Sequence, residues 1–199
     1  MLHTPNIQMA ELAAIALEIP IVLGRTKGEK EYEVRDIEAT ILEAKRKFDF
    51  TFLASGGLAS EYQRSRLAQV AKATELTSMN PLWGIDQKRY VVQLAQDGYR
   101  FILTAVAADG LDEKWLGREM DVVLAEKLVS LSEKFRFNPA LEGGEGETLV
   151  LDCPLYSRQR IEIVEAEKTW DGYRGRLEIK KARLIPKLSS VATAVGKLK

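Results

Sequence analysis

The sequence predicts an α/β fold: a domain built on a parallel sheet, followed by a smaller α+β part with antiparallel strands. Three observations lead to this prediction. Short apolar segments alternate with amphipathic helical segments from Thr4 to Phe135, which is typical of βα units. Polar loops, most of which contain glycine, follow the apolar segments, as loops do at the carboxyl ends of parallel strands. After Asp152 polar and apolar residues alternate, which indicates half-exposed strands.

The first elements of the predicted parallel sheet lie before residue 55. Thr4 is a candidate N-cap of the first helix, with Pro5 at its first helical position. Residues 20–23 are a short apolar segment that predicts a strand, and residues 50–54 predict the next strand. The helices before these strands have apolar faces formed by Met9, Leu12, Ala13 and Ala16, and by Val34, Ile37, Ile41, Ala44 and Phe48.

Two more helices and two more strands are expected before residue 110. A third helix is predicted over residues 60–74, and a weaker strand over residues 78–82. Asp86 is the predicted N-cap of a fourth helix, which ends at Gly98. Residues 101–106 form the clearest buried strand in the sequence, and we expect them in the same parallel sheet.

The last part of the chain is predicted to combine one helix with antiparallel strands. Residues 160–164 and 176–180 alternate polar with apolar side chains on either side of a turn at residues 171–175. We therefore expect an α/β domain over residues 1–120, a smaller α+β domain over residues 121–187, and a flexible tail over residues 188–199. The helix of the smaller domain has Asp121 as its N-cap and an apolar face of Leu124, Leu128, Leu131 and Phe135.

Composition narrows the classes of function. The 29 Lys and Arg residues balance the 29 Asp and Glu residues, so net charge gives no reason to expect nucleic acid or a membrane surface as a partner. The single cysteine, Cys153, excludes an internal disulfide and a cysteine-rich metal site, and we expect a buried thiol. The single histidine, His3, argues against a Ser-His-Asp triad. The sequence shows no bilayer-spanning apolar run and no secretory leader, so we expect a cytoplasmic protein.

A segment rich in glutamate and glycine is the first candidate site. Glu142, Glu145 and Glu147 alternate with three glycines just before an apolar run that predicts a buried strand. Because glycine tolerates positive φ and close approach by other groups, we expect a tight loop at a strand edge. Such a loop suits an amine, a hydrated Mg²⁺, or backbone donors aimed at a carboxylate. A plain turn with solvated glutamates is the alternative interpretation.

A second group of candidates follows the predicted strands of the parallel sheet. Cations in or just beyond these loops could hold a phosphate together with helix N-termini. Arg64 and Arg66 are two residues apart on a helix, so at most one of them faces a ligand. Trp83 and Trp115 could stack on a base or pack in the core. The remaining candidates are Arg25 and Lys27 for phosphate, and Asp109, Asp112 and Glu113, which suit either Mg²⁺ or a solvated turn.

Four stretches occur in order along the chain: HTPN at residues 3–6, ASEYQRSR at 59–66, GLDEKWLGR at 110–118 and EGGEGETLVLD at 142–152. Together they resemble the diphthine–ammonia ligase family, a branch of the ATP pyrophosphatases. The resemblance extends to about Lys187 and implies a Rossmann-like, adenine nucleotide alpha hydrolase-like domain that binds nucleotide, followed by a smaller substrate-side domain. It also implies that ATP, with Mg²⁺, activates the carboxylate of diphthine, a modified histidine of elongation factor 2. Ammonia then attacks the acyl-adenylate to give diphthamide.

The same resemblance implies roles for individual residues, and it is compatible with a homo-oligomer. Arg64 is the expected contact of the α-phosphate. Glu145 and Glu147 are the expected catalytic residues, because a carboxylate can hold ammonium and take its proton. The expected nucleotide-binding residues are His3, Gly56, Gly57, Glu61, Tyr62, Gln63 and Arg64. The expected substrate-binding residues are Glu142, Gly143, Gly144 and Thr148, and the metal ligands stay unassigned.

The sequence departs from the family pattern in two places. The family's Ser-Gly-Gly-x-Asp-Ser loop, which holds pyrophosphate, is not in this sequence, and Ser55-Gly56-Gly57 is followed by Leu58-Ala59-Ser60 instead. Met1 matches a point just after the family's second strand, so we expect either a partner that supplies the first strands or a natural start upstream. A non-catalytic derivative that binds nucleotide or a partner is the alternative function. The second departure is Gly146, where relatives usually carry a bulky aromatic residue, and we expect a looser loop there.

Overall fold

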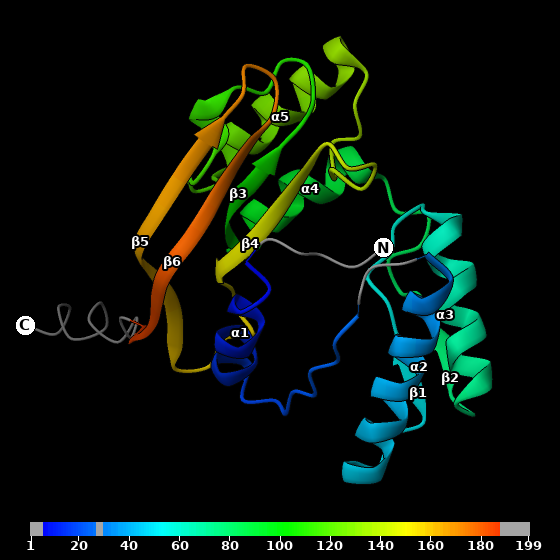
Figure 1. Ribbon diagram of the computed structural model, residues 1–199. Helices are drawn as coiled ribbons and strands as arrows, with labels where there is room; N and C mark the ends of the chain where they lie inside the picture. Colours follow the sequence, from blue (N-terminus) through cyan, green and yellow to red (C-terminus); the bar gives the residue numbers. More distant parts are fainter. Residues whose placement is uncertain (1–5, 27–29, 188–199) are drawn as a thin grey trace, which may run out of the picture.

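The computed structural model describes residues 6–26 and 30–187, which form two groups of elements (Figure 1). The small lobe consists of α2, α3, β1 and β2, and the large lobe contains a four-stranded sheet with α1, α4 and α5. The elements are α1 (Met9–Leu17), α2 (Lys30–Lys47), β1 (Phe52–Ala54), α3 (Glu61–Ala73), β2 (Thr77–Met79), α4 (Gln87–Gln96), β3 (Arg100–Val106), the 3₁₀ helix η1 (Glu113–Trp115), α5 (Val122–Phe135), β4 (Gly146–Asp152), β5 (Gln159–Trp170) and β6 (Gly175–Pro186).

The small lobe is a βαβ unit with a second helix beside it. Strands β1 and β2 pair in parallel, with Phe52 opposite Thr77, and α3 connects them. Ser60 caps α3, since its side chain accepts a hydrogen bond from the backbone N–H of Gln63. The strand predicted over residues 78–82 ends earlier, at Met79, because the chain turns at residues 81–84. Parallel pairing in this part of the chain confirms the predicted βα arrangement.

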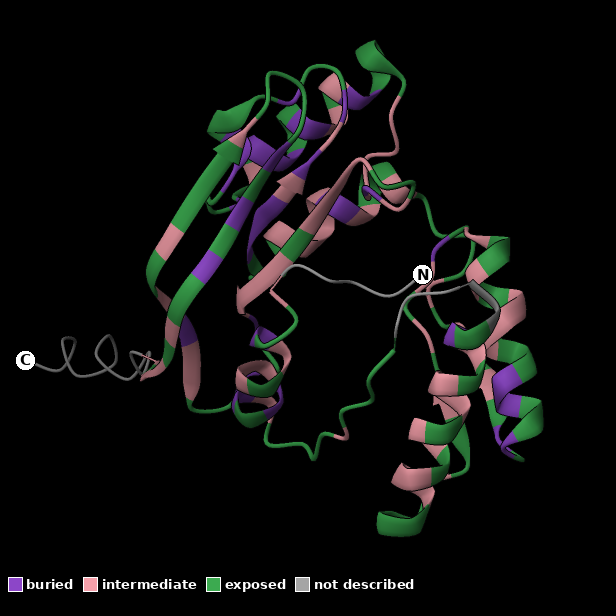
Figure 2. Ribbon diagram, viewed as in Figure 1, coloured by how far each residue is buried: buried purple, intermediate pink, exposed green. Residues whose placement is uncertain are grey.

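The large lobe holds most of the buried core. Its sheet is antiparallel, in the order β4-β3-β6-β5, and α4 and α5 cover one face (Figure 1). Leu103, Leu128 and Ile179 are at most 2% exposed. Figure 2 shows the buried residues concentrated where the sheet meets these helices. The predicted caps are confirmed: Asp86 accepts from the N–H groups of α4, and Asp121 does so for α5.

Two predicted strands have a different arrangement in the structure. Residues 20–23 are not a strand, and Ile19, Ile21 and Leu23 are 54%, 41% and 55% exposed. A strand needs the backbone of a neighbour, and none of the described strands pairs with this segment. Residues 101–106 do form a buried strand, but β3 pairs antiparallel with β4 and β6. The prediction of a single parallel sheet through residue 106 was therefore wrong.

These pairings also place the boundary between the two lobes at a different point of the chain than the sequence predicted. Helix α4 and strand β3 both precede residue 120, yet they pack with α5 and β4 in one core. Within the described residues, the boundary between the two lobes therefore lies between β2 and α4, whereas the sequence predicted a division near residue 120. The predicted N-cap at Thr4–Pro5 and the predicted tail at 188–199 lie outside the described residues.

Helix α1 packs against the hairpin of β5 and β6 rather than against the small lobe. Ala16 joins a cluster with Cys153, Tyr156 and Ile161, and Cys153 is buried as predicted. The segment before α1 also bonds to the part of β6 that β3 leaves unpaired. Strand β3 pairs with β6 only at Arg176 and Gly175, and beyond these positions the side chain of Asn6 bonds to the backbone of Leu177 and Ile179.

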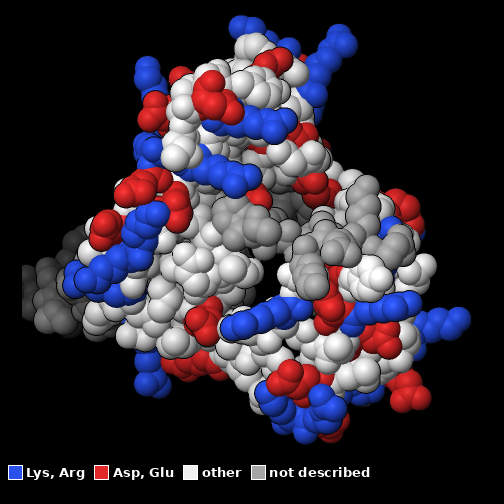
Figure 3. All heavy atoms as spheres, in the orientation of Figure 1, with Lys and Arg blue, Asp and Glu red and all other residues white. Residues whose placement is uncertain are grey.

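The surface carries charges of both signs. Lys and Arg side chains are interspersed with Asp and Glu side chains over the face shown in Figure 3. This mixture agrees with the balanced composition of the sequence. Among the described residues, no helix combines the length and apolar character that crossing a membrane requires.

Candidate functional site

The two predicted site segments meet at a cavity of about 620 Å³ between the lobes. One wall is the loop of residues 55–59, which follows β1, together with α3. The other wall is the Glu–Gly loop (residues 141–145) and the start of β4. Segments more than eighty residues apart in the sequence therefore face each other. The lining residues are Ser55, Gly56, Gly57, Leu58, Gln63, Leu67, Ala140, Leu141, Glu142, Gly144, Gly146, Glu147 and Thr148.

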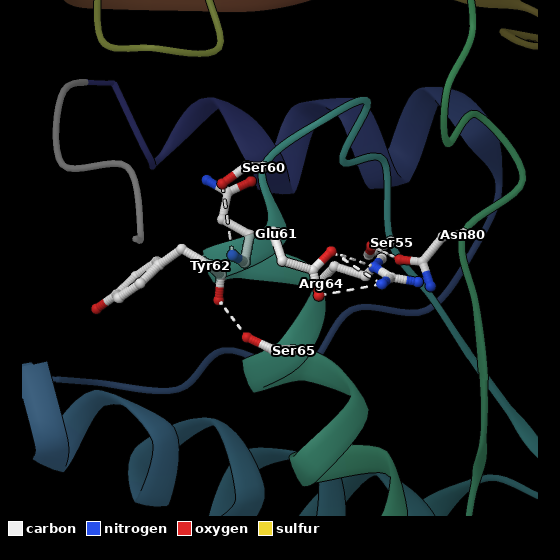
Figure 4. A network of polar contacts seen from close by, with 8 residues as sticks. Ser55, Ser60, Glu61, Tyr62, Arg64, Ser65 and Asn80 are labelled. Carbon is white, nitrogen blue, oxygen red and sulfur yellow. Dashed lines mark hydrogen bonds and ion pairs between the residues drawn. The ribbon is translucent and has the colours of Figure 1, made fainter.

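The loop of residues 55–59 is anchored to the small lobe. The backbone N–H of Ser55 donates to the carbonyl of Met79 at 2.9 Å, and the Ser55 hydroxyl donates to Asn80 Oδ1 at 2.6 Å, as Figure 4 shows for the side chains. The carbonyl of Leu58 accepts from the N–H of Gly84 at 2.9 Å. Beside Gly56 there is open space where a Cβ would stand, so a ligand can approach this backbone closely.

Glu142 joins the two walls directly. Its Oε1 accepts a hydrogen bond from the backbone N–H of Leu58 at 2.6 Å, and its Oε2 accepts one from the N–H of Ala59 at 2.9 Å. Bonds from N–H groups to an ionised carboxylate are shorter and stronger than bonds between neutral groups. The structure therefore gives the Glu142 carboxylate two backbone partners across the cavity, where the sequence had suggested contact with substrate.

Glu145 fastens its own loop. Its carboxylate accepts from the backbone N–H of Gly143 at 2.7 Å and from that of Asn138 at 3.1 Å. Gly143 leaves the necessary room, because a Cβ there would lie 2.7 Å from Glu145 Oε1. Gly144 has a φ of +93°, which glycine adopts without strain. Glu145 and Gly143 are not among the residues that line the cavity.

Glu147 is the glutamate that β4 presents to the cavity. It lies opposite Ala105 of β3, inside the strand rather than on the preceding loop. Glu147 and Thr148 also line a second cavity of about 230 Å³, which lies beside α1. The neighbouring Gly146 is not loosely held: a Cβ there would lie 2.7 Å from the carbonyl oxygen of Ala105. The expected loosening of the loop at Gly146 is therefore wrong, because β4 and β3 approach each other closely at this position.

At the start of α3, the side chains of Glu61, Tyr62 and Arg64 are exposed and do not line the cavity, whereas Gln63 does line it. The guanidinium of Arg64 forms two hydrogen bonds to Glu61, at 2.9 and 3.0 Å (Figure 4). These bonds raise the pKa of Arg64 above its ordinary value. The guanidinium also lies over the ring of Trp83, 4.5 Å from its centroid. Tyr62 is 43% exposed. The assignment of Glu61, Tyr62 and Arg64 to nucleotide binding thus stays a prediction, with no geometric support in the cavity.

The other predicted candidates that the structure describes do not line the cavity. His3 lies outside the described residues. Trp115 is only 6% exposed and belongs to the core, and Asp112 caps η1 by accepting from the N–H of Lys114 at 3.0 Å. Among the described parts of the chain, no three His, Cys, Asp or Glu side chains come together in a way that could hold a metal ion.

Several contributors to the site escaped the sequence analysis. The N–H groups of Leu58 and Ala59 hold Glu142, but backbone donors leave no signature in residue type. An apolar cavity of about 280 Å³ adjoins the site and shares part of its lining. Tyr90 lies there with Tyr99, and burial raises the pKa of Tyr90. No local pattern around Tyr90 or Tyr99 distinguishes a cavity residue from an ordinary core residue.

Comparison with known proteins agrees with the geometry. A family model described as the diphthamide synthase N-terminal domain matches residues 1–78, and one described as the diphthamide synthase C-terminal domain matches residues 86–185. The boundary between the two matches falls between β2 and α4, where the two lobes divide, although α1, within the first match, packs in the large lobe. The two walls of the cavity therefore come from the two matched domains.

Curated relatives are named diphthine–ammonia ligase. The Danio rerio protein is 32% identical over 184 residues, which cover 85% of this chain and 70% of the relative. The Homo sapiens protein is 31% identical over 160 residues, covering 76% of this chain and 60% of the relative. The Schizosaccharomyces pombe protein is 40% identical over 119 residues, but these are 60% of this chain and only 19% of that longer protein. The chain belongs to the diphthamide synthase family.

Proposed function

We propose that this chain carries the ATP-dependent amide-forming reaction of a diphthine–ammonia ligase, with the cavity between the lobes as its site. In the first step the substrate carboxylate attacks the α-phosphate of ATP, giving an acyl-adenylate and releasing pyrophosphate. In the second step ammonia attacks the acyl carbon, giving the amide and AMP, and one proton is released. The observation that carries this proposal is the convergence of Gly56, Gly57 and Gln63 from one matched domain with Glu147 and Thr148 from the other.

The wall of residues 55–59 is suited to the nucleotide. Gly56 and Gly57 offer backbone that no side chain blocks, since a Cβ at Gly57 would meet other atoms only at 3.8 Å or more. Phosphate groups bind in such concave, glycine-containing backbone. Mg²⁺ would come with the phosphates of ATP, because this ion usually keeps several waters and needs only one or two protein carboxylates.

The opposite wall is suited to the second step. Ammonium must lose a proton before nitrogen can attack, and a carboxylate close to the reacting nitrogen can accept it. Glu147 is the carboxylate of strand β4 that lines the cavity. Because Glu147 lines the cavity and Glu145 does not, we assign proton transfer to Glu147; the bonds that Glu145 accepts from Asn138 and Gly143 assign it to loop geometry.

A side chain of a large protein can reach this site. Gly144 and Thr148 line the cavity and are exposed, so the cavity opens at the surface. We propose elongation factor 2 carrying diphthine as the protein substrate and the cytoplasm as the compartment. The relatives' name gives diphthine and ammonia as the groups that those proteins join.

A second function is a non-catalytic relative that binds nucleotide or a partner. Arg64, the expected contact of the α-phosphate, lies outside the cavity lining and bonds to Glu61, and this favours the alternative. Incubating the protein with ATP, ammonium and diphthine-bearing elongation factor 2, and following the modified residue by mass spectrometry, separates the two. Conversion of carboxylate to amide, with equal release of AMP, supports the ligase. Nucleotide binding without any amide would contradict it and favour the alternative.

A further inference from the structure

We propose that Glu142 is a positioning residue whose carboxylate clamps the loop of residues 55–59 to the Glu–Gly loop and thereby sets the distance between the two walls of the cavity. The significance of this clamp for catalysis rests on the proposed function. The contact itself can be tested without any activity.

The contact uses both oxygens of the carboxylate on adjacent amides of the other lobe. Leu58 N–H is 2.6 Å from Oε1 and Ala59 N–H is 2.9 Å from Oε2. This two-point arrangement fixes orientation as well as distance, as bidentate charge-assisted bonds do. The partners are 84 and 83 residues away in the sequence, so the bonds join segments that the chain itself does not hold together.

Each side of the clamp is anchored separately. On the small lobe, Ser55 bonds to Met79 and Asn80, and Leu58 bonds to Gly84. On the large lobe, the bonds from Glu145 to its own loop hold the backbone from which Glu142 projects. Leu141, just before Glu142, is only 6% exposed. Each loop is thus fixed within its own lobe, and the Glu142 carboxylate connects the two.

Loss of the Glu142 contact should mainly lower the rate of the catalysed reaction. Gly57 lies next to the clamp, where its Cβ position would be 3.8 Å from both Glu142 Oε1 and Gln63 Oε1. The nucleotide wall and Glu147 must act on one acyl group, and small errors in the separation of reacting groups strongly lower the rate. A clamp therefore affects kcat, whereas a residue that only binds substrate affects KM.

The contact is tested by amide hydrogen exchange on the free protein. In Glu142→Gln the amides of Leu58 and Ala59 should exchange about tenfold faster or more, since a charged acceptor is lost. The amides of β5 and β6 should be unchanged. Glu167→Gln, which removes an exposed carboxylate on β5, is the matched control and should leave Leu58 and Ala59 as in the parent protein. Unchanged exchange of these two amides in Glu142→Gln would overturn the proposal.

The positioning role is tested by the kinetics of amide formation. Glu142→Gln should lower kcat about tenfold or more while the melting temperature stays close to that of the parent protein. Glu142→Asp should not restore kcat, because its side chain is one methylene too short to reach both amides. A rise in KM for the protein substrate at unchanged kcat would overturn the proposal in favour of direct substrate binding. A faster reaction would overturn it too, since Glu142 would then block a site that substrate needs.

If the parent protein makes no amide, the proposed function fails. The exchange experiment would still decide whether the clamp exists.

Discussion

Replacing Gly146 by alanine should disturb the site through a single methyl group. Gly146 is the first residue of β4 and lies opposite Val106 of β3. An added Cβ would stand 2.7 Å from the carbonyl oxygen of Ala105 and 3.1 Å from Leu141 Cδ1. The leucine side chain can move aside, but the oxygen belongs to the backbone of a central strand. Strand β4 must therefore shift away from β3, and Glu147 shifts with it.

The size of this effect follows from the contact. Forcing extra volume into a packed site typically costs about 1–3 kcal/mol. Gly56→Ala is the matched control, because nothing lies within 4 Å of its added Cβ and its φ is not left-handed. There the substitution should stabilise the protein by about 0.4–1 kcal/mol, through the unfolded chain. The two variants should thus differ by about 1.5–4 kcal/mol in free energy of unfolding.

Thermal unfolding followed by calorimetry measures this difference. In a protein of this size each kcal/mol lowers the melting temperature by roughly 2–4 °C. Gly146→Ala should melt below the parent protein, and Gly56→Ala should melt at or slightly above it. Equal melting temperatures for the two variants would refute the close approach of β4 to β3 at this residue.

Three further predictions concern other parts of the protein. Burial raises the pKa of Tyr156 to about 12, so the folded protein keeps a proton that the unfolded chain releases near pH 10. Stability should therefore fall between these pH values, and Tyr156→Phe should reduce that fall in denaturant titrations. If Arg64 contacts the α-phosphate, Arg64→Ala should raise the activation free energy of pyrophosphate release by about 1.5–3 kcal/mol. An unchanged rate would mean that Arg64 is only a surface partner of Glu61. If the protein holds ATP only through its adenosine and α-phosphate, calorimetry should find AMP and ATP bound about equally, and clearly tighter ATP would show that another group holds the outer phosphates.

The elements that were predicted correctly have local signals. Asp86 and Asp121 cap helices because a short acceptor side chain can reach N–H groups two or three residues ahead, and this can be read from neighbouring letters. Gly98 ends α4 with a φ of +84°, which the residue type also predicts. The pairing of strands has no such local signal. Residues 20–23 and 101–106 both read as apolar strands, but whether and with which partner a strand pairs depends on distant segments.

The candidate site shows the same division. The glycines and glutamates identified the two segments, and the structure brings both to one cavity. Residue type could not show what each glutamate does. Glu145 bonds to backbone two and seven residues away, whereas the partners of Glu142 come from another lobe. The surface pairing of Arg64 with Glu61 was within reach of the sequence, because residues three apart on a helix are neighbours.

The most direct test of the proposed site is to measure both half-reactions in Glu147→Gln and Glu145→Gln. Pyrophosphate release reports adenylation, and amide formation from ammonium reports transfer. Glu147→Gln should adenylate at the parental rate and transfer about a hundred- to ten-thousandfold more slowly, because a positioned proton acceptor is lost. Glu145→Gln should instead speed exchange of the Asn138 and Gly143 amides. Parental transfer by Glu147→Gln, or loss of its adenylation with transfer intact, would contradict the assignment of proton transfer to Glu147.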